Sequence, residues 1–278
     1  MAKQAFNGLG TQEWAKNSRS VWNDVSSPRR NNALKHGATF PQKLSDRVIA
    51  LYSNVGDMVL DPFLGTGTTA LSALSLQRSC IGFELSEEFF SLASTAVNDL
   101  HTSLFNKSHS YRIQQGDCLE LLDTIEDNSI SLTLTSPPYA NLIHKVLDDR
   151  KKRHKKSAFV IDNNATTRLY TNDKRDFGNM DLQQYREAVL QLMQKLFLKT
   201  KSKGYNVWVV KDFRDTRNGI PYVDLHSIVA GLGQEAGFQY HDLIIWDQNE
   251  RRRLVLLGYP SVFYVNQNHS FLVVLRKA

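Results

Sequence analysis

The chain has 278 residues, of which 41% are hydrophobic and 22% are charged. These are ordinary values for a globular protein, so the chain has enough apolar material for a core without disulfide bonds. No run of about 18 apolar residues and no charged-then-apolar leader occurs, which predicts a cytoplasmic protein with no membrane partner. Cys80 and Cys118 have no metal-ligand spacing. We expect both to be reduced packing residues, and we expect no metal site.

The net charge of +6 comes from one place in the sequence. Six cations lie within residues 150–156, and their number equals the whole excess of bases over acids. They are Arg150, Lys151, Lys152, Arg153, Lys155 and Lys156. Basic runs of this kind often contact nucleic acid. A solvated loop that binds nothing is the alternative.

Short apolar runs alternate with stretches in which apolar residues recur at helical spacing. The predicted helices are 40–54, 68–77, 87–104, 118–124, 181–202 and 223–236. The predicted strands are 58–60, 80–83, 111–115, 130–135, 206–210, 243–246 and 271–275. This alternation predicts an α/β fold with a parallel sheet covered on both faces, and the last run suits a final antiparallel strand. Trp14 and Trp22 are expected to anchor the irregular residues 1–35 on the core.

Residues 140–180 interrupt the alternation. They are polar, basic and without periodicity, and they directly follow a predicted strand. Ligands bind outside the carboxyl ends of the strands in open α/β sheets, so an insertion here overhangs the binding edge. We therefore expect a single domain, residues 1–278, in which the inserted segment 140–180 carries the basic run to a nucleic acid.

A glycine-rich turn follows the first long strand and opens a helix. Its sequence is Asp61-Pro62-Phe63-Leu64-Gly65-Thr66-Gly67-Thr68-Thr69. Glycines permit a tight turn and a close approach of a ligand to the backbone. No lysine follows the second glycine, which disfavours a Walker-type phosphate loop. The acid at the strand tip, Asp61, instead suits a cationic amino-acid ligand.

Two further acids follow the next two strands. Glu84 ends one of them, where an acid can accept both hydroxyls of a ribose. Asp117 follows the other, where it either accepts a hydrogen bond from an adenine amine or caps the next helix. Three acids at successive strand ends around one glycine turn predict a nucleoside with a positively charged amino-acid tail. S-adenosylmethionine is such a molecule.

The fourth strand ends in Ser136-Pro137-Pro138-Tyr139. Two prolines fix the backbone and remove two donors, which leaves a rigid turn that presents carbonyl oxygens, a hydroxyl and an aromatic face. Such a turn can hold a planar base that bears an NH2 group, because a carbonyl and the Ser136 hydroxyl accept its two N–H bonds. Tyr139 can stack on the base, which is worth roughly 1–3 kcal/mol. An ordinary proline turn is the alternative, which the neighbouring glycine turn disfavours.

The glycine turn 61–69 and the tetrapeptide 136–139 together make the chain resemble the DNA amino-methyltransferases, which methylate cytosine at N4 or adenine at N6. The resemblance implies the class I Rossmann-like methyltransferase fold, with a seven-stranded, mostly parallel sheet whose last strand is antiparallel. It also implies that residues 36–41 flank the methionine part of S-adenosylmethionine. The implied cofactor contacts are Phe40, Pro41, Asp61, Phe63, Gly65, Gly67, Thr68, Glu84 (ribose) and Asp117 (adenine), and the implied catalytic residues are Ser136, Pro137, Pro138 and Tyr139.

The resemblance implies a site-specific enzyme that flips a base out of double-stranded DNA and methylates its exocyclic amine directly. Neither cysteine follows a proline, which disfavours carbon-5 cytosine chemistry. Serine at the first motif position favours cytosine N4 over adenine N6. The sequence leaves open an RNA or protein amino-methyltransferase, an inactive DNA-binding homologue, and a partner restriction endonuclease of a restriction–modification system. The catalytic motif follows the glycine turn, in the reverse of the order common among family members with SPPY. We expect no separate target-recognition domain.

Overall fold

The computed structural model describes residues 7–25, 40–103, 109–140, 171–215, 219–251, 261 and 263–278. The six cations of the basic run and residues 141–170 of the expected insertion lie outside these ranges. The helices are α1 (Thr11–Asn17), α3 (Gln42–Tyr52), α4 (Thr68–Ser75), α5 (Glu87–Ser103), α6 (Cys118–Leu121), α8 (Leu182–Lys199) and α9 (Leu225–Glu235), with short 3-10 turns η1 (Leu122–Thr124), η2 (Phe177–Asn179) and η4 (Asn249–Arg251). The strands are β1 (Val21–Trp22), β2 (Met58–Asp61), β3 (Ser79–Glu84), β4 (Tyr111–Gln115), β5 (Ile130–Thr135), β6 (Thr200–Val210), β7 (Phe213–Asp215), β8 (Ile220–Val223), β9 (Gln239–Asp247) and β10 (His269–Arg276).

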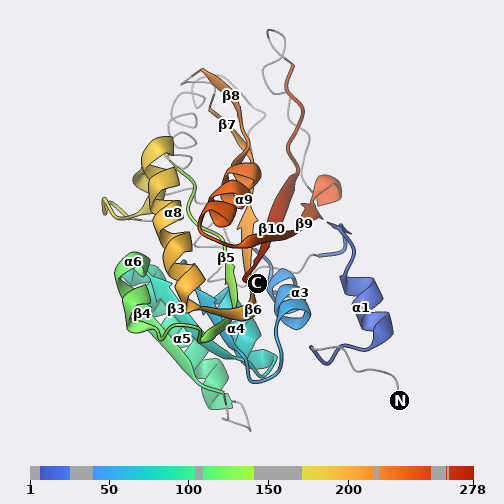
Figure 1. Ribbon diagram of the computed structural model, residues 1–278, viewed down its shortest axis with the longest axis vertical. Coiled ribbons are helices and arrows are strands. Elements are labelled where there is room, and N and C mark those ends of the chain that lie inside the picture. Colours follow the sequence, from blue (N-terminus) through green and yellow to red (C-terminus); the bar gives the residue numbers. More distant parts are fainter. Residues whose placement is uncertain are drawn as a thin grey trace.

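Eight strands form the main sheet, in the order β1-β9-β10-β6-β5-β2-β3-β4 (Figure 1). Strand β10 is antiparallel to both neighbours, and the other pairings are parallel. The predicted Rossmann-like α/β fold and its antiparallel last strand are therefore confirmed. The predicted number of seven strands is one too low, because β1 adds a two-residue strand beside β9. Two residues are too few to produce a periodic pattern.

Helices cover both faces of the sheet, as the alternation predicts (Figure 1). Helices α3, α4 and α5 pack on one face against side chains such as Val59, Leu134 and Val209. Helices α6, α8 and α9 pack on the other face against Ile130 and Trp208. Because neighbouring side chains along a strand point to opposite faces and both faces are covered, each of the strands β2, β3, β5 and β6 is buried along most of its length. No helix in the described part of the chain has the length and apolar character that a membrane span requires.

The two tryptophans near the N-terminus behave differently. Trp22 is 1% exposed and donates from Nε1 to the Arg19 carbonyl, so its expected role as an anchor is confirmed. Trp14 is 38% exposed, so the prediction that it anchors on the core is wrong. Trp14 lies on α1, which contributes no buried residue, whereas Trp22 enters the sheet edge through β1.

A small antiparallel hairpin, β7–β8, continues from the carboxyl end of β6 (Figure 1). Since β2, β3, β4, β5 and β6 run parallel, their carboxyl ends meet at one edge of the sheet. Residues that follow these strands are therefore brought together although they lie far apart in the sequence. We call this the carboxyl edge.

Candidate functional site

The glycine turn leaves β2 at the carboxyl edge and leads into α4. Gly65 and Gly67 have positive φ angles of 57° and 89°, a conformation that favours glycine. A Cβ atom on Gly67 would also lie 3.3 Å from the Cβ of Ala93, so the turn is packed tightly on α5. Thr68 begins α4 directly after the second glycine. The spacing of the two glycines therefore has a physical cause, since the chain turns back on itself against another helix.

Asp61, at the end of β2, is buried and accepts three hydrogen bonds from its own chain. Its Oδ1 accepts the Thr135 hydroxyl at 2.7 Å and the Phe63 amide at 3.1 Å, and its Oδ2 accepts the Thr69 hydroxyl at 2.6 Å. Burial raises the pKa of this carboxyl from 3.8 to about 6, although the hydrogen bonds oppose the rise. Through these contacts Asp61 joins the start of α4 to the last residue of β5.

Glu84 ends β3 beside the glycine turn. Its carboxylate accepts the Gly65 amide at 2.7 Å and the Ser86 amide at 2.8 Å. Burial raises the pKa of Glu84 from 4.5 to about 7, and the two backbone hydrogen bonds only partly offset this. A carboxylate has about four acceptor positions, so two remain for a ligand that donates hydroxyl hydrogens.

Asp117 follows β4 and caps α6. Its Oδ1 accepts a hydrogen bond from the Leu119 amide at 2.9 Å. The helix cap, one of the two roles that the sequence predicts for Asp117, is therefore present. The amide of the preceding Gly116 donates to the Glu84 carbonyl at 2.9 Å. The second carboxylate oxygen is available to a ligand, so the cap leaves an adenine contact open.

The tetrapeptide Ser136–Tyr139 continues from β5 without regular secondary structure. Leu60 of β2 pairs with Thr133 of β5, so the tetrapeptide leaves the sheet beside the glycine turn. Pro137 is buried, while the other three residues are partly exposed. Tyr139 packs on the core beneath α8 and α9. The two sequence motifs therefore open onto the same edge, as their interpretation requires.

Phe40 and Pro41 lie at the start of α3, on the α3–α4 face of the sheet. Pro41 is the N-cap residue of α3 and is buried. Phe40 is partly buried against the same core. The cations at 150–156, which the sequence assigns to DNA contacts, lie outside the described residues.

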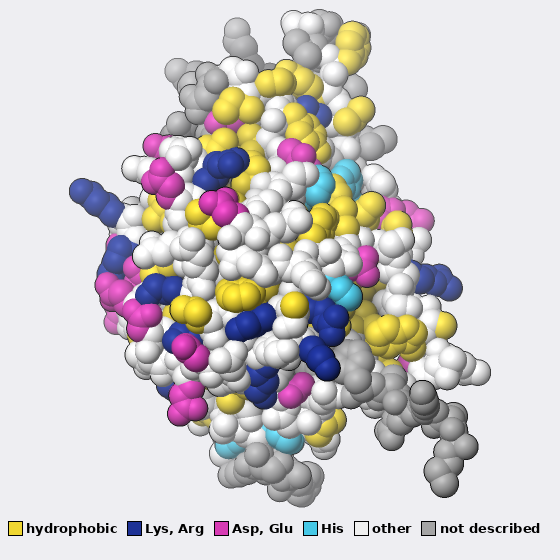
Figure 2. Space-filling model, viewed as in Figure 1, with side chains coloured by type: hydrophobic (Ala, Val, Ile, Leu, Met, Phe, Trp, Pro, Cys, Tyr) yellow, Lys and Arg dark blue, Asp and Glu magenta, His cyan; other side chains and the backbone are white. Residues whose placement is uncertain are grey.

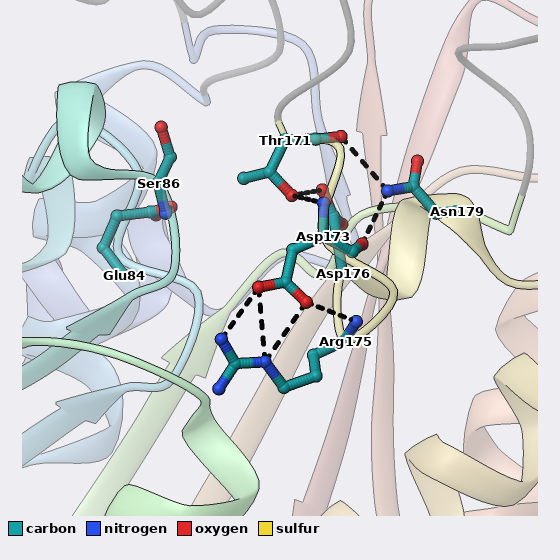
Figure 3. Close-up of polar contacts among 7 residues, drawn as sticks. All are labelled: Glu84, Ser86, Thr171, Asp173, Arg175, Asp176 and Asn179. Atoms are coloured by element: carbon teal, nitrogen blue, oxygen red, sulfur yellow. Dashed lines mark hydrogen bonds and ion pairs between the residues drawn. The ribbon is translucent and has the colours of Figure 1, made fainter.

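The described end of the expected insertion, residues 171–180, lies over the part of this edge that carries the glycine turn and Glu84 (Figure 3). Asp176 accepts the Gly178 amide at 2.8 Å and the Thr171 hydroxyl at 3.1 Å, and burial raises its pKa. Its charge also contributes to the raised pKa of Glu84. The Phe177 ring stacks edge-on against Phe63 of the glycine turn, with centroids 5.0 Å apart. Neither Asp176 nor Phe177 was predicted from the sequence, because a lone Asp-Phe pair in a polar stretch has no recognisable pattern.

A hollow of about 680 Å³ opens between this segment, α6 and the first turns of α8. Its wall includes Leu119, which is two residues from Asp117, and Asn172 and Asn179 of the overlying segment. The lining is mixed polar and apolar. The hollow therefore borders the strand end at which a nucleoside base was predicted.

At the other end of the edge, Asp212 follows β6 and organises a second polar group. It is 2% exposed, and its Oδ2 lies 2.8 Å from the Tyr222 hydroxyl and 2.9 Å from Nδ1 of His226. Asp224 lies 2.9 Å from the same His226 nitrogen. The three residues Asp212, Asp224 and His226 could bring ligand atoms within 4.8 Å of one another. Hydrogen bonding between the imidazole and the carboxylates accounts for this grouping.

Comparison with known proteins gives one family match and several partial relatives. Residues 2–95 match the sequence profile of a family described as DNA methylase. The type II methyltransferase M.MthZI of Methanothermobacter thermautotrophicus is 45% identical over 83 residues, which cover 28% of this chain and 23% of that protein. The type II methyltransferase M.BglI of Bacillus subtilis is 35% identical over 134 residues, covering 45% and 38%. The chain thus spans less than half the length of these relatives.

Among solved structures, TrmN from Thermus thermophilus aligns with 89% of this chain and 51% of its own, at 16% identity and a TM-score of 0.48. At this score the likeness carries no argument about function.

Proposed function

Because the chain belongs to the DNA amino-methyltransferase family, we propose that it transfers a methyl group from S-adenosylmethionine to the exocyclic amine of a base in double-stranded DNA. The hydrogen bond between Thr135 and Asp61 carries this proposal, since it joins the glycine turn to the strand that ends in Ser136. A methyl donor in the turn and an amine on the tetrapeptide would then meet at one edge. Proximity and alignment supply most of the acceleration in such a transfer.

The residues present fit this cofactor. Glu84 is a mostly buried acid with two engaged and two available acceptor positions, which suits the two hydroxyls of a ribose. Asp117 has one oxygen left for the adenine amine. Phe40 and Pro41, together with Asp61, Phe63, Gly65, Gly67 and Thr68, would surround the methionine part. When bound, S-adenosylmethionine supplies an electrophilic methyl group on a sulfonium centre.

Ser136, Pro137, Pro138 and Tyr139 would hold the target base. A carbonyl of Ser136 or Pro137 and the Ser136 hydroxyl accept the two N–H bonds of the amine, which turns its lone pair towards the methyl carbon. Tyr139 stacks on the ring and offsets part of the cost of extruding the base, which is a few kcal/mol. Methyl transfer to an amine held in this way would form an N–C bond at the expense of the S–C bond of the sulfonium, and the nitrogen would then release a proton to solvent.

Cytosine N4 is the base position that we propose, with adenine N6 as the alternative. The test is to incubate the chain and S-adenosylmethionine with a DNA duplex library, digest the product to nucleosides and identify the methylated nucleoside. We expect N4-methylcytosine. Finding N6-methyladenine alone would overturn the choice of base, and methylation of RNA or protein in parallel incubations, without methylation of DNA, would overturn the proposed substrate class.

The basic run 150–156 is proposed to bind the phosphates of the duplex. Six phosphate contacts would make the logarithm of affinity fall against the logarithm of salt concentration with a slope of about −5. Replacing the six cations by glutamine should weaken binding and flatten this slope. An unchanged slope would contradict the role. An inactive homologue would bind DNA but would have no measurable affinity for S-adenosylmethionine. Titrating the chain with S-adenosylmethionine therefore tests whether it is such a homologue.

A further inference from the structure

The two most exposed large apolar side chains of the described residues, and a third exposed one, lie at the carboxyl edge. Phe263 is 81% exposed and Val265 is 75% exposed, and Tyr222 on β8 is 43% exposed. Figure 2 shows hydrophobic side chains gathered at this end of the molecule, over the β7–β8 hairpin and the segment that enters β10, with a Lys or Arg side chain among them. Single exposed apolar residues are common on soluble proteins, whereas a group of them indicates a contact surface.

One arginine binds the two parts of this group together. The guanidinium of Arg214, on β7, lies 4.4 Å from the ring centroid of Tyr264 and 5.5 Å from that of Tyr222. It also donates to the Pro221 carbonyl at 3.0 Å and to the Val265 carbonyl at 3.4 Å. An arginine stacked between aromatic rings loses little further conformational entropy when it binds a ligand, because its side chain is already held in place.

The group is anchored to the same sheet as the catalytic tetrapeptide. The Tyr222 hydroxyl donates to Asp212 directly beyond β6, and the backbone and ring of His226 bind the same carboxylate. The His226 ring stacks on Phe271 of β10, with centroids 4.0 Å apart. Thr135 pairs with Trp208 in β6, and Phe271 pairs with Val210, so the anchor lies close beyond the strand end that carries Ser136.

We propose that Arg214, Tyr222, Phe263, Tyr264 and Val265, here called the aromatic edge, contact double-stranded DNA beside the target base, with Phe263 and Val265 entering the base stack that this base vacates. The proposal rests on the proposed function. Extruding a base leaves an apolar gap between its neighbours, and exposed apolar side chains are the groups that fill such gaps in duplexes. The cation Arg214 suits the phosphates that flank the gap. Of the nearby acids, Asp212 and Asp215 are turned inward, at 2% and 6% exposure, and the half-exposed Asp224 is held by His226 at 2.9 Å.

The test uses two duplexes that contain the recognition sequence, found by sequencing DNA from cells that express the chain. One duplex is intact, and the other lacks the base opposite the target, which lowers the cost of extrusion. For Phe263→Ala we expect roughly tenfold weaker binding to the intact duplex, the size of one lost stacking contact. Val265→Ala should weaken it in the same direction but by less, because valine does not stack. Binding to the second duplex should change by less than about twofold, because extrusion of the unpaired target costs less there and depends less on a side chain that offsets this cost.

Matched controls lie at the opposite, amino ends of the strands. Val55, before β2, is 60% exposed and matches Val265, and Tyr240, near the start of β9, is 40% exposed and matches Tyr222. Val55→Ala and Tyr240→Ala should leave the affinity for both duplexes unchanged. Phe263→Trp should retain binding, and an unchanged unfolding temperature shows that each variant is folded.

Three results would overturn the aromatic edge: wild-type affinity of Phe263→Ala for the intact duplex, equal losses on both duplexes, or a dimer of the chain that the variant dissociates while DNA binding is unaffected. Tighter, Phe263-dependent binding to RNA of the same sequence would also overturn it. Methyl transfer by the wild-type chain tests the proposed function separately. If the proposed function is wrong, the wild-type chain transfers no methyl group to any DNA. If so, the affinities are compared on mixed-sequence duplexes that carry the same missing base.

Discussion

The two halves of the carboxyl edge are held in shape by different kinds of contact. On the cofactor side, which comprises the ends of β2, β3 and β4, backbone hydrogen bonds join neighbouring turns in addition to the Glu84 carboxylate: the Leu64 amide donates to the Phe83 carbonyl at 2.8 Å, and the Gly116 amide donates to the Glu84 carbonyl at 2.9 Å. On the target side, side chains make the connections, with Tyr222 and His226 both bound to Asp212. Backbone contacts persist through most substitutions, whereas side-chain contacts depend on residue identity. The target side is therefore where a few substitutions can change what is bound.

A single buried carboxylate connects the two halves. Asp61 accepts hydroxyl groups from Thr69 on the cofactor side and Thr135 on the target side. Neither hydroxyl can be replaced by water without opening the core, because Thr69 is 1% exposed and Thr135 is 0% exposed. The relative position of methyl donor and target amine should therefore depend on Asp61, although its oxygens are occupied by the chain itself.

The largest expected effect is a loss of methyl transfer that leaves cofactor binding intact. Tyr139→Ala removes the ring proposed to stack on the base, and Pro138→Ala loosens the turn, so each should lower the rate of methyl transfer by roughly 100-fold or more. Cofactor affinity, measured by calorimetry, should stay within about threefold because the glycine turn keeps its backbone contacts. Tyr139→Phe, which retains the ring, is the control. Normal turnover of Tyr139→Ala would remove the catalytic assignment of the tetrapeptide.

The second prediction addresses the connection through Asp61. Thr135→Val leaves a buried carboxylate oxygen with one hydrogen bond fewer, and should lower the free energy of unfolding by about 1–3 kcal/mol. Thr133→Val is a matched control on the same strand, since Thr133 is also 0% exposed and its hydroxyl has no hydrogen-bond partner in the described structure. That variant should be neutral or slightly stabilising in urea unfolding. Equal effects of the two variants would show that the Asp61 contact contributes little.

The same contrast explains how much of the site could be predicted from sequence. Glycines at 65 and 67 and acids at the ends of β2, β3 and β4 follow from local rules, because parallel strands bring consecutive strand ends together. The sequence predicts that Asp61 faces a cationic ligand, but it does not predict the hydrogen bonds that Asp61 accepts from Thr69 and Thr135. Thr135 is 74 residues away in the chain, and threonine in a strand is ordinary.

The tetrapeptide was predicted from the sequence, but its surroundings on either half of the edge were not. Phe177 reaches Phe63 from a polar segment without periodicity, and Arg214 reaches Tyr264 across 50 residues. Such contacts depend on the paths of loops, which hydrophobic periodicity does not encode. Strand β1 was missed for a related reason, since its two residues are defined by their pairing with β9.

The third prediction concerns the pH dependence of cofactor binding. With a pKa of about 7, Glu84 is ionised in about one molecule in ten at pH 6 and nine in ten at pH 8. Ribose hydroxyls donate to the ionised form, so affinity for S-adenosylmethionine should rise roughly tenfold over this range. Because the folded pKa lies above the ordinary value, the same group's contribution to stability falls as pH rises from about 4.5 to 7. Glu84→Gln should bind more weakly and lose the pH dependence near 7. A slope that survives this substitution would assign the titration to another group.

The smallest expected effect distinguishes the two roles of Asp117. Removing the cap of α6 in Asp117→Ala should lower the free energy of unfolding by about 1 kcal/mol. Asp181→Ala is the control, because Asp181 caps α8 by accepting the Gln184 amide at 2.9 Å. Both variants should lose similar stability, but only Asp117→Ala should also bind S-adenosylmethionine more weakly, by roughly fivefold for one lost neutral-donor hydrogen bond. An unchanged affinity in Asp117→Ala would make Asp117 a helix cap alone. The adenine would then have to be recognised by other groups, and the hollow beside Leu119 is where they should be sought.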